Sequence, residues 1–240
     1  MNLLVDFGNT RVKAAIFNDG RLMAKSAFDQ AEDLFLWLNK YNGIQKCLIG
    51  SVTKAHEAVY ALLQKQFTTT LFKTDTPTPL QNLYHSALTL GSDRLAASVG
   101  AYHLCPNKNV LSIDAGTCIK YNFVNHKNEY LGGAISPGLQ MRLKAMHHYT
   151  AALPVVEMDK QYTKLVGTNT QESLLSGALT ATACEVDGMI GRYLIAYTDL
   201  EVYVTGGDAA YLCKQVKNRF FAEPDLIMIG LNSILDFNDK

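Results

Sequence analysis

The hydrophobic pattern of the first third of the chain predicts short strands in alternation with amphipathic helices. Apolar runs bounded by polar turns indicate strands, and helical spacing of apolar residues indicates helices. The predicted elements are strands at 3–5, 12–17 and 21–28, a helix capped by Asp29 with Glu32 in capping-box position, a strand at 46–52, a helix at 53–66 and a strand at 69–72. The predicted order is therefore β-β-β-α-β-α-β.

A proline-rich stretch at 76–79 interrupts regular structure, because each proline restricts the residue before it. Ser92 then follows as the predicted N-cap of a helix that runs to about Leu104. Asp93 and Arg94 lie in the first turn of this helix. Taken alone, Asp93 would stabilise the helix dipole and Arg94 would form a surface ion pair.

The strand pattern restarts after Asn107. A strand at 109–113 ends in Asp114-Ala115-Gly116-Thr117, and the following pattern predicts strands at 118–124 and 130–135 and a helix at 136–147. An acid, a glycine and a threonine also follow the first strand of the chain, so we interpret the pattern as an internal duplication of architecture. We predict two α/β halves, 1–107 and 108–240, around one cleft with Asp6 and Asp114 on opposite sides.

The last part of the chain contains a long predicted helix, 171–197, with glycines at 177, 188 and 191. Glycine weakens a helix by about 1 kcal/mol relative to alanine, so these positions indicate close helix contact, either at a subunit interface or inside the monomer. A strand at 201–204, a Thr-Gly-Gly-Asp turn, a helix from Ala209, an apolar run at 226–229 and a short helix at 231–237 complete the pattern.

Composition narrows the functional classes. The chain has 240 residues, with 22 Lys plus Arg against 22 Asp plus Glu, so charge does not favour a nucleic-acid or membrane partner. No apolar run approaches the roughly 20 residues that span a bilayer, and no export pattern precedes the first strand. The five cysteines are scattered without a C-x-x-C motif, which predicts reduced thiols and a cytoplasmic protein.

The first hairpin, residues 6–13, is the strongest candidate for chemistry. Gly8 lets the turn backbone approach a bulky ligand, and Asn9 and Thr10 offer N–H groups and short polar side chains to phosphate oxygens. Asp6 could hold a hydrated Mg²⁺, and Lys13 adds positive charge. The alternative is an ordinary β-hairpin with a polar turn. Neither a G-x-x-x-x-G-K-[ST] loop nor a G-x-G-x-x-G motif is present.

Two acid–glycine–threonine turns and a later Thr-Gly-Gly stretch resemble the superfamily of acetate and sugar kinases, Hsp70 and actin, whose duplicated ribonuclease-H-like domains clamp ATP. Within it the chain resembles the type III pantothenate kinases, in that family's motif order and over almost the whole chain. The motifs that carry this resemblance are Asp6-x-Gly-Asn-Thr-x-x-Lys13, Leu90-Gly91-x-Asp93-Arg94, Asp114-x-Gly-Thr117, Gly132-Gly133-Ala134-Ile135-x-Pro137-Gly138 and Gly167-x-Asn169-Thr170.

The resemblance implies a homodimeric enzyme that phosphorylates pantothenate with ATP, the first step towards coenzyme A. Asp93 would be the general base, Asp114 would bind a monovalent cation (K⁺ or NH₄⁺), and Mg²⁺ would accompany ATP, held by Asp6 through water. The ATP-binding residues would be Asp6, Phe7, Gly8, Asn9, Thr10, Arg11, Val12, Lys13 and Thr117. The pantothenate-binding residues would be Tyr84, Gly91, Ser92, Asp93, Arg94 and Thr170. Without the resemblance, Tyr84 would be a packing residue and Thr170 a helix cap.

The chain also departs from the family pattern. Ala87 stands where members usually carry a proline, and after Asp114-x-Gly-Thr the family tends to have a small residue, then Thr, then Asp, where this chain has Cys118, Lys120 and Asn122. Lys120 puts a cation near the expected K⁺ or triphosphate site, and we hypothesise that it replaces part of the K⁺ requirement. Two other functions remain as alternatives: a catalytically inactive nucleotide-binding regulator on the same fold, and a different small-molecule kinase.

Overall fold

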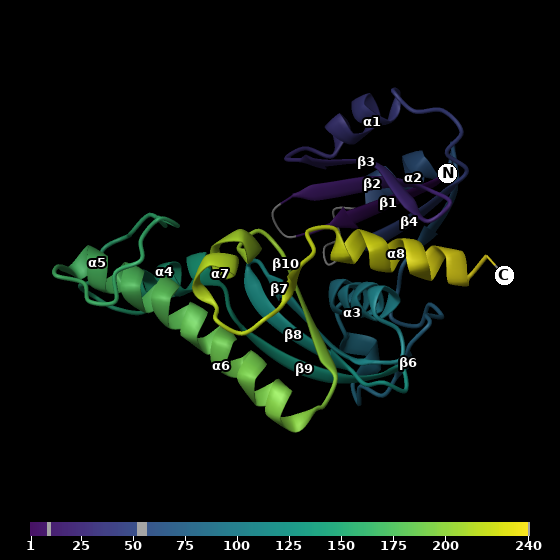
Figure 1. The fold of residues 1–240 in the computed structure, drawn as a ribbon. Helices are drawn as coiled ribbons and strands as arrows, with labels where there is room; N and C mark the ends of the chain where they lie inside the picture. The colour runs from purple at the N-terminus through teal and green to yellow at the C-terminus, as the bar shows by residue number, and fades with distance from the viewer. Residues whose placement is uncertain (9–10, 52–56, 240) are drawn as a thin grey trace. The chain divides into compact units, whose positions relative to one another are not determined.

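The structure is a computed structural model that describes residues 1–8, 11–51 and 57–239. The predicted ATP-binding residues Asn9 and Thr10 and the start of the predicted helix 53–66 lie outside these ranges. Two compact units make up the chain (Figure 1). Unit 1 comprises Met1–Asn107, Val124–Leu131 and Asp225–Lys240, and unit 2 comprises Lys108–Phe123 and Gly132–Pro224.

Unit 1 is built on a sheet of the order β3-β2-β1-β4-β5. Its strands are β1 (Asn2–Phe7), β2 (Val12–Asn18), β3 (Arg21–Phe28), β4 (Lys46–Ser51) and β5 (Thr68–Leu71). The first three strands form an antiparallel meander, and β4 and β5 run parallel to β1. The central strand β1 therefore has an antiparallel and a parallel neighbour.

Helices cover both faces of this sheet. Alternate residues of β1, Leu3, Val5 and Phe7, are buried in a cluster with the apolar sides of α1 (Glu32–Leu38) and α2 (Glu57–Leu63). The opposite face, which carries Asp6, is covered by α3 (Ser92–Leu104) and α8 (Leu226–Phe237), which lie side by side (Figure 1). The two-residue side-chain period of a strand thus directs Asp6 to the α3 and α8 side of the sheet.

The contact between α3 and α8 depends on two glycines. A Cβ on Gly230 would lie 1.9 Å from the carbonyl oxygen of Ala96, and a Cβ on Gly100 would lie 2.1 Å from that of Leu226. The two helix backbones therefore approach more closely than any other residue type would allow. This contact fixes α8 in unit 1, although the sequence analysis assigned it to the second half.

Unit 2 repeats the topology of the first sheet. The second sheet has the order β11-β10-β7-β8-β9-β6. Read from β9 to β11, with β7 counted as the first strand, this order is third, second, first, fourth, fifth, which is the order in unit 1. Its strands are β7 (Asn109–Ala115), β8 (Cys118–Val124), β9 (Glu129–Pro137), β10 (Leu200–Thr205) and β11 (Phe221–Ala222), and β6 (Gln81–Asn82) pairs with the start of β9. As in unit 1, the first strand is parallel to the fourth. The predicted duplicated α/β fold is confirmed.

Four helical segments pack against the second sheet or follow it. They are α4 (Leu139–His148), α5 (Thr170–Leu175), α6 (Ala181–Ala196) and α7 (Ala209–Gln215), and a π-helical turn at Ser176–Thr180 joins α5 to α6. Apolar residues of α5, α6 and α7 share one core with the inner strands β7, β8 and β10. No helix in the described ranges is both long and apolar enough to cross a membrane.

Several local predictions were wrong. The helix α1 begins at Glu32 without a side-chain cap, and Asp29 instead pairs with Arg11 at 2.8 Å. Residues 136 and 137 end β9 rather than begin a helix, which is consistent with the extended backbone that precedes a proline. The C-terminal helix starts at Leu226, five positions before the predicted start at Leu231. Gly230, which directly precedes the predicted start, lies inside the helix.

Candidate active site

Asp6 lies at the carboxyl end of the central strand of unit 1. Its side chain is 6% exposed, and its Oδ1 would lie 3.9 Å from a Cβ built on Gly50, its register partner in the parallel strand β4. Its partner in β2 is the exposed Lys13, which therefore projects from the same face of the sheet. A carboxylate and an ammonium thus occupy one edge of the sheet, as the sequence predicts.

The N-terminus of α3 is anchored to this same edge. Ser92 Oγ donates a hydrogen bond of 3.0 Å to the carbonyl oxygen of Ser51, the last residue of β4 and the register partner of Phe7. Asp93 follows in the first turn of α3, and its Oδ1 accepts the backbone N–H of Arg94 at 2.8 Å. Asp6 and Asp93 therefore belong to one side and one edge of the unit 1 sheet.

Gly91 leaves room for the Asp93 carboxylate. A Cβ at Gly91 would lie only 2.5 Å from Asp93 Oδ1, so a larger residue there would push the carboxylate away from the helix N-terminus. The family-like stretch Gly91-Ser92-Asp93 therefore has a local physical reason: Gly91 makes space, Ser92 fixes the helix to β4, and Asp93 carries the acid. The predicted N-cap role of Ser92 is wrong, because Gly91 is the N-cap and Ser92 is the first helical residue.

Arg94 and Tyr84 lie together in unit 1. The guanidinium carbon of Arg94 lies 5.5 Å from the centre of the Tyr84 ring, and that ring meets Tyr130 edge-on at 6.0 Å. Arg94 is 6% exposed, so it is not the surface ion pair that its position in the helix alone would suggest. A buried guanidinium held against an aromatic face is suited to bind a carboxylate.

Asp114 occupies in unit 2 the place that Asp6 has in unit 1. It is the penultimate residue of the central strand β7, and its register partner in the parallel strand β10 is Thr205. Its Oδ2 lies 2.8 Å from the ammonium of Lys120 on β8, and both side chains are largely buried. The predicted proximity of Lys120 to Asp114 is therefore observed.

A glycine turn after β10 packs directly on this edge. Gly206 has a φ of +96°, and a Cβ there would lie 2.3 Å from the Ala115 carbonyl oxygen and 2.7 Å from Asp114 Oδ1. The backbone N–H of Asp208 donates to the same Ala115 carbonyl at 3.0 Å. Lys160 then pairs with Asp208 at 2.7 Å and donates to the carbonyl of Gly207 at 3.0 Å. The edge of the second sheet thus carries two acid–lysine pairs.

Thr117, the predicted phosphate contact, lies exposed in the turn after β7. Its carbonyl accepts the N–H of Gly138 at 3.1 Å, and a Cβ on Gly138 would lie 2.1 Å from the Gly116 carbonyl oxygen. The Pro137-Gly138 motif therefore supports the Gly116–Thr117 turn from behind, and only glycine allows that contact.

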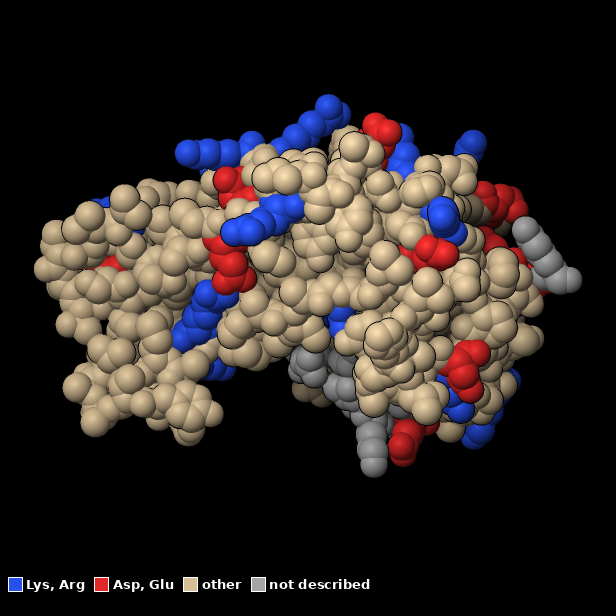
Figure 2. All heavy atoms as spheres, turned by 90° about the horizontal axis from the view of Figure 1, so that it is seen from below, with Lys and Arg blue, Asp and Glu red and all other residues tan. Residues whose placement is uncertain are grey.

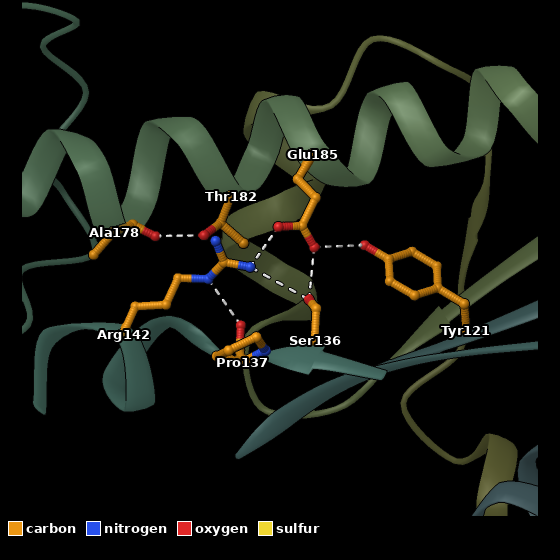
Figure 3. Close-up of polar contacts among 7 residues, drawn as sticks. All are labelled: Tyr121, Ser136, Pro137, Arg142, Ala178, Thr182 and Glu185. Atoms are coloured by element: carbon orange, nitrogen blue, oxygen red, sulfur yellow. Dashed lines mark hydrogen bonds and ion pairs between the residues drawn. The ribbon is translucent and has the colours of Figure 1, made fainter. Parts of the chain in front are cut away.

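A polar network in unit 2 holds the Pro137-Gly138 segment in place (Figure 3). Arg142 of α4 donates from Nε to the Pro137 carbonyl at 2.9 Å and pairs with Glu185 of α6. Glu185 also accepts the hydroxyl of Ser136 at 2.6 Å, while the phenol of Tyr121 lies within 3.5 Å of it. Burial and the Glu185 carboxylate raise the pKa of Tyr121, so the phenol stays protonated and donates. Two helices and two strands thus meet at the support of the Thr117 turn.

The remaining predicted residues have mixed surroundings. Phe7 and Val12 are buried, so their side chains belong to the core and contact with ATP would come from their backbone. Gly8 N–H donates to the Arg11 carbonyl at 3.2 Å across the turn. Thr170 is exposed as the first residue of α5, and the helix cap is Asn169, whose side chain accepts the N–H of Glu172 at 2.9 Å.

Sequence reasoning missed several residues that shape these edges. Gly100 and Gly230 were not singled out, although glycine inside an otherwise helical, apolar pattern is itself a signal of close backbone approach. The pairing of Lys160 with Asp208, and of Arg142 with Glu185, joins segments far apart in the sequence, and no local pattern indicates it.

Comparison with known proteins identifies the family. A family model described as type III pantothenate kinase matches residues 2–192. A type III pantothenate kinase from Christiangramia forsetii is 40% identical, and one from Bacteroides fragilis is 39% identical; in both cases 99% or more of each chain is covered.

Solved structures show the same fold. A Campylobacter jejuni protein described as a member of the Baf family of transcriptional activators has a TM-score of 0.63 at 21% identity, covering 99% of this chain and 98% of its own. A ROK hexokinase from Thermus thermophilus has a TM-score of 0.53 at 14% identity, with 99% of both chains covered. At these identities the likeness concerns the fold alone. From its family model and its full-length relatives, the chain belongs to the type III pantothenate kinase family.

Proposed function

We propose that the protein transfers the γ-phosphoryl group of ATP to the hydroxyl of pantothenate. This is the reaction for which its family is named, and it is the first step of coenzyme A biosynthesis. The observation that carries the proposal is the Ser92–Ser51 hydrogen bond, which joins the Asp93 turn to the sheet edge that holds Asp6. Phosphoryl transfer needs a positioned alcohol, a group that takes its proton and stabilisation of charge on the phosphates.

Asp93 is proposed as the general base. Its carboxylate belongs to the first turn of α3, and Oδ1 accepts the Arg94 N–H, a contact that restrains the orientation of the side chain. The base takes the hydroxyl proton as the oxygen attacks the γ-phosphorus, and the bond to the bridging oxygen of ADP breaks.

Arg94 and Tyr84 are proposed to bind the acid end of pantothenate. The guanidinium can donate two parallel hydrogen bonds to a carboxylate, and the Tyr84 ring beneath it limits the directions in which it can point. Because Arg94 directly follows Asp93, binding of the carboxylate would fix the distance between the acid end of the substrate and the base. Gly91 is proposed to contact pantothenate through its main chain, and Thr170 is proposed as a further polar contact.

We propose two contacts for the phosphates of ATP, each within one unit: the hairpin at 6–13 and the turn that ends in Thr117. Lys13 on the Asp6 side of the first sheet offsets phosphate charge, and the Thr117 turn offers exposed backbone and a hydroxyl. The Gly138 support and the Glu185–Arg142 network keep the second turn rigid, which preserves the geometry during transfer.

The residues present fit Mg²⁺ as a companion of ATP rather than as a resident ion. Among the described residues, no group of three or more His, Cys, Asp or Glu side chains is arranged to hold a metal. Asp6 is a single buried carboxylate, which suits a Mg²⁺ that keeps most of its waters and binds mainly to phosphates. When bound, the ion neutralises charge that develops on the β- and γ-phosphate oxygens.

The residues present do not fit a monovalent cation at Asp114. One of its carboxylate oxygens already lies 2.8 Å from the Lys120 ammonium, so a second cation there would face a like charge at close range. We therefore derive no step through K⁺ or NH₄⁺.

We also propose that the protein is a homodimer through the helix formed by α5 and α6. Four small residues, Gly177, Ala181, Cys184 and Gly188, are exposed and share one helical face. Among the described residues, a Cβ on either glycine would meet no atom within 4 Å beyond its chain neighbours and the adjacent backbone of its own helix. The glycines therefore do not serve packing inside the monomer. Ile195, further along α6, is 89% exposed. Few charged side chains lie at the α5 end of unit 2 in Figure 2. A face of small residues suits an isologous contact with a second copy.

Oligomeric state tests the dimer directly. Gly188→Arg is expected to shift the sedimentation coefficient from that of a dimer to that of a monomer, whereas Leu36→Arg, at an exposed leucine of α1, is expected to leave the dimer intact. A parent protein that sediments as a monomer at micromolar concentration would contradict the dimer.

Product identification tests the reaction. The parent protein is incubated with MgATP and pantothenate, and the mixture is analysed by mass spectrometry for the phosphomonoester and by a coupled assay for ADP. We expect phosphopantothenate and ADP in equal amounts, and a much lower rate with the analogue whose carboxylate is replaced by an alcohol. ATP binding without any turnover would instead favour the nucleotide-binding regulator.

A further inference from the structure

The carboxyl edge of the second sheet carries its own positive charge. Lys120 Nζ lies 2.8 Å from Asp114 Oδ2, with the two side chains only 19% and 12% exposed. A surface lysine would be free to move away from its partner, but these two groups are fixed on neighbouring strands, β8 and β7, and are screened from water by their surroundings. The ammonium is therefore a permanent feature of the edge that precedes Thr117.

A second lysine neutralises the other acid of this edge. Asp208 is held beside Ala115 by its backbone N–H, and its carboxylate pairs with Lys160 at 2.7 Å. The two carboxylates and the two ammonium groups sum to zero charge. Without the lysines, the same edge would present two negative charges to an incoming triphosphate, which would need mobile cations to offset them.

The neighbouring positions of β8 add no negative charge to this site. Lys120 contributes one positive charge, and Asn122 is a neutral amide. Asn122 is completely buried on β8, two positions after Lys120 and therefore on the same face of the strand. The side chains at 114, 122 and 120 are therefore an acid, an amide and an ammonium.

We propose that the Lys120 ammonium is the built-in monovalent cation of this enzyme and that catalysis needs neither K⁺ nor NH₄⁺. The inference rests on the proposed pantothenate kinase activity for its functional meaning. An alkylammonium has the charge and the N–H donors of NH₄⁺, and its tether to β8 keeps it beside Asp114 at any salt concentration. Lys120 thus offsets negative charge near the Thr117 turn when ATP binds.

The first test compares rates in different salts. Pantothenate phosphorylation is measured in potassium chloride and in tetramethylammonium chloride at equal ionic strength, for the parent and for the double variant Lys120→Thr/Asn122→Asp. For the parent, the rates in the two salts are expected to agree within about twofold. The double variant is expected to be about tenfold faster in potassium chloride, a common size for coupling between two ligands. Lys120→Thr alone is expected to lie between them.

A control variant removes another lysine of unit 2 that forms an ion pair. Lys108 pairs with Glu201 at 2.9 Å at the opposite end of β7 and β10. Lys108→Thr therefore removes one cation from unit 2 without touching the Asp114 edge, and its rate ratio between the salts is expected to equal that of the parent. If Lys108→Thr gained the same K⁺ activation as Lys120→Thr, a general charge effect would explain the result and the proposal would fall.

A second readout is independent of turnover. A cation that binds the native state raises Tm with its concentration. Increasing potassium chloride, relative to tetramethylammonium chloride, should raise Tm of the double variant and leave that of the parent unchanged. A parent that needs K⁺ for activity, or whose Tm rises specifically with K⁺, overturns the proposal. If the parent turns over no pantothenate in any salt, the kinase assignment fails, and the Tm series still decides whether Asp114 takes a cation.

Discussion

Replacing Ser92 with alanine tests whether the anchoring of α3 to β4 positions the reaction. The substitution removes the 3.0 Å hydrogen bond from Ser92 Oγ to the Ser51 carbonyl and leaves the neighbouring Asp93 in place. Ser98 offers a matched control in the same helix, because its hydroxyl donates at 2.8 Å to the Arg94 carbonyl one turn earlier in that helix. Both variants exchange a buried serine hydroxyl for hydrogen.

The expected magnitudes differ for stability and for catalysis. Loss of the Ser92 bond costs about 1 kcal/mol of unfolding free energy, the usual net value of a neutral hydrogen bond. For a chain of this size that corresponds to a decrease in Tm of about 2–4 °C. A misplacement of a reacting group by 1 Å costs about 100-fold in rate. The glycine contact with α8 restrains the rest of α3, so we expect Asp93 to move by about half that distance in Ser92→Ala. Such a shift should lower kcat/KM about tenfold.

The assay is the initial rate of ADP formation over a range of pantothenate concentrations, with Tm measured on the same samples. Ser92→Ala is expected to lose activity out of proportion to its small loss of stability. Ser98→Ala is expected to keep the parent kcat/KM, since its local bond within the helix adds little and alanine favours the helix. Equal losses of activity in the two variants, or parent-like activity in Ser92→Ala, would refute the positioning argument.

Three further predictions concern other parts of the chain. Gly138→Ala places a Cβ 2.1 Å from the Gly116 carbonyl, so it should displace the Thr117 turn and raise KM for ATP more than KM for pantothenate in steady-state kinetics; equal increases would contradict this. Gly230→Ala overpacks the α3–α8 contact and should cost about 1–3 kcal/mol in urea denaturation, and an unchanged midpoint would count against the close helix approach. Backbone N–H groups of residues 218 and 217 lower the pKa of Asp187, so its stabilising effect is complete above the unfolded pKa of about 3.9 and is lost as pH falls. The free energy of unfolding should thus depend less on pH below 5 in Asp187→Asn than in the parent, and identical slopes would refute the assignment.

Much of the fold could be predicted because its signals are local. The strand at 118–124 has the observed bounds of β8, and the repeated strand–acid–glycine pattern correctly indicated two sheets of equal topology. Strand alternation and turn residues act over a few positions, so a single sequence displays them. The contact between Gly91 and the Asp93 carboxylate is equally local, but the bond from Ser92 to Ser51 joins distant segments, and the sequence predicted an N-cap there instead.

Contacts between distant segments could not be predicted in the same way. No nearby residue indicates that α8 packs against α3 or that Lys160 forms an ion pair with Asp208. Nor does one indicate that Asp29 pairs with Arg11 instead of capping α1. Each depends on the path of the chain in space rather than on local propensity. Lys120 is the exception, because its strand directly follows the turn after Asp114 and a short connection makes them neighbours.

The most direct test of the central claim is the turnover and MgATP affinity of Asp93→Asn. Asparagine keeps the size of the side chain and its contact with the Arg94 N–H, but it cannot take the proton of the pantothenate hydroxyl. We predict that kcat falls about 100- to 10,000-fold. The Kd for MgATP, measured by calorimetry, should stay within about twofold of the parent value, because only a transition-state interaction is lost. A variant that phosphorylates pantothenate at the parent rate would contradict the account.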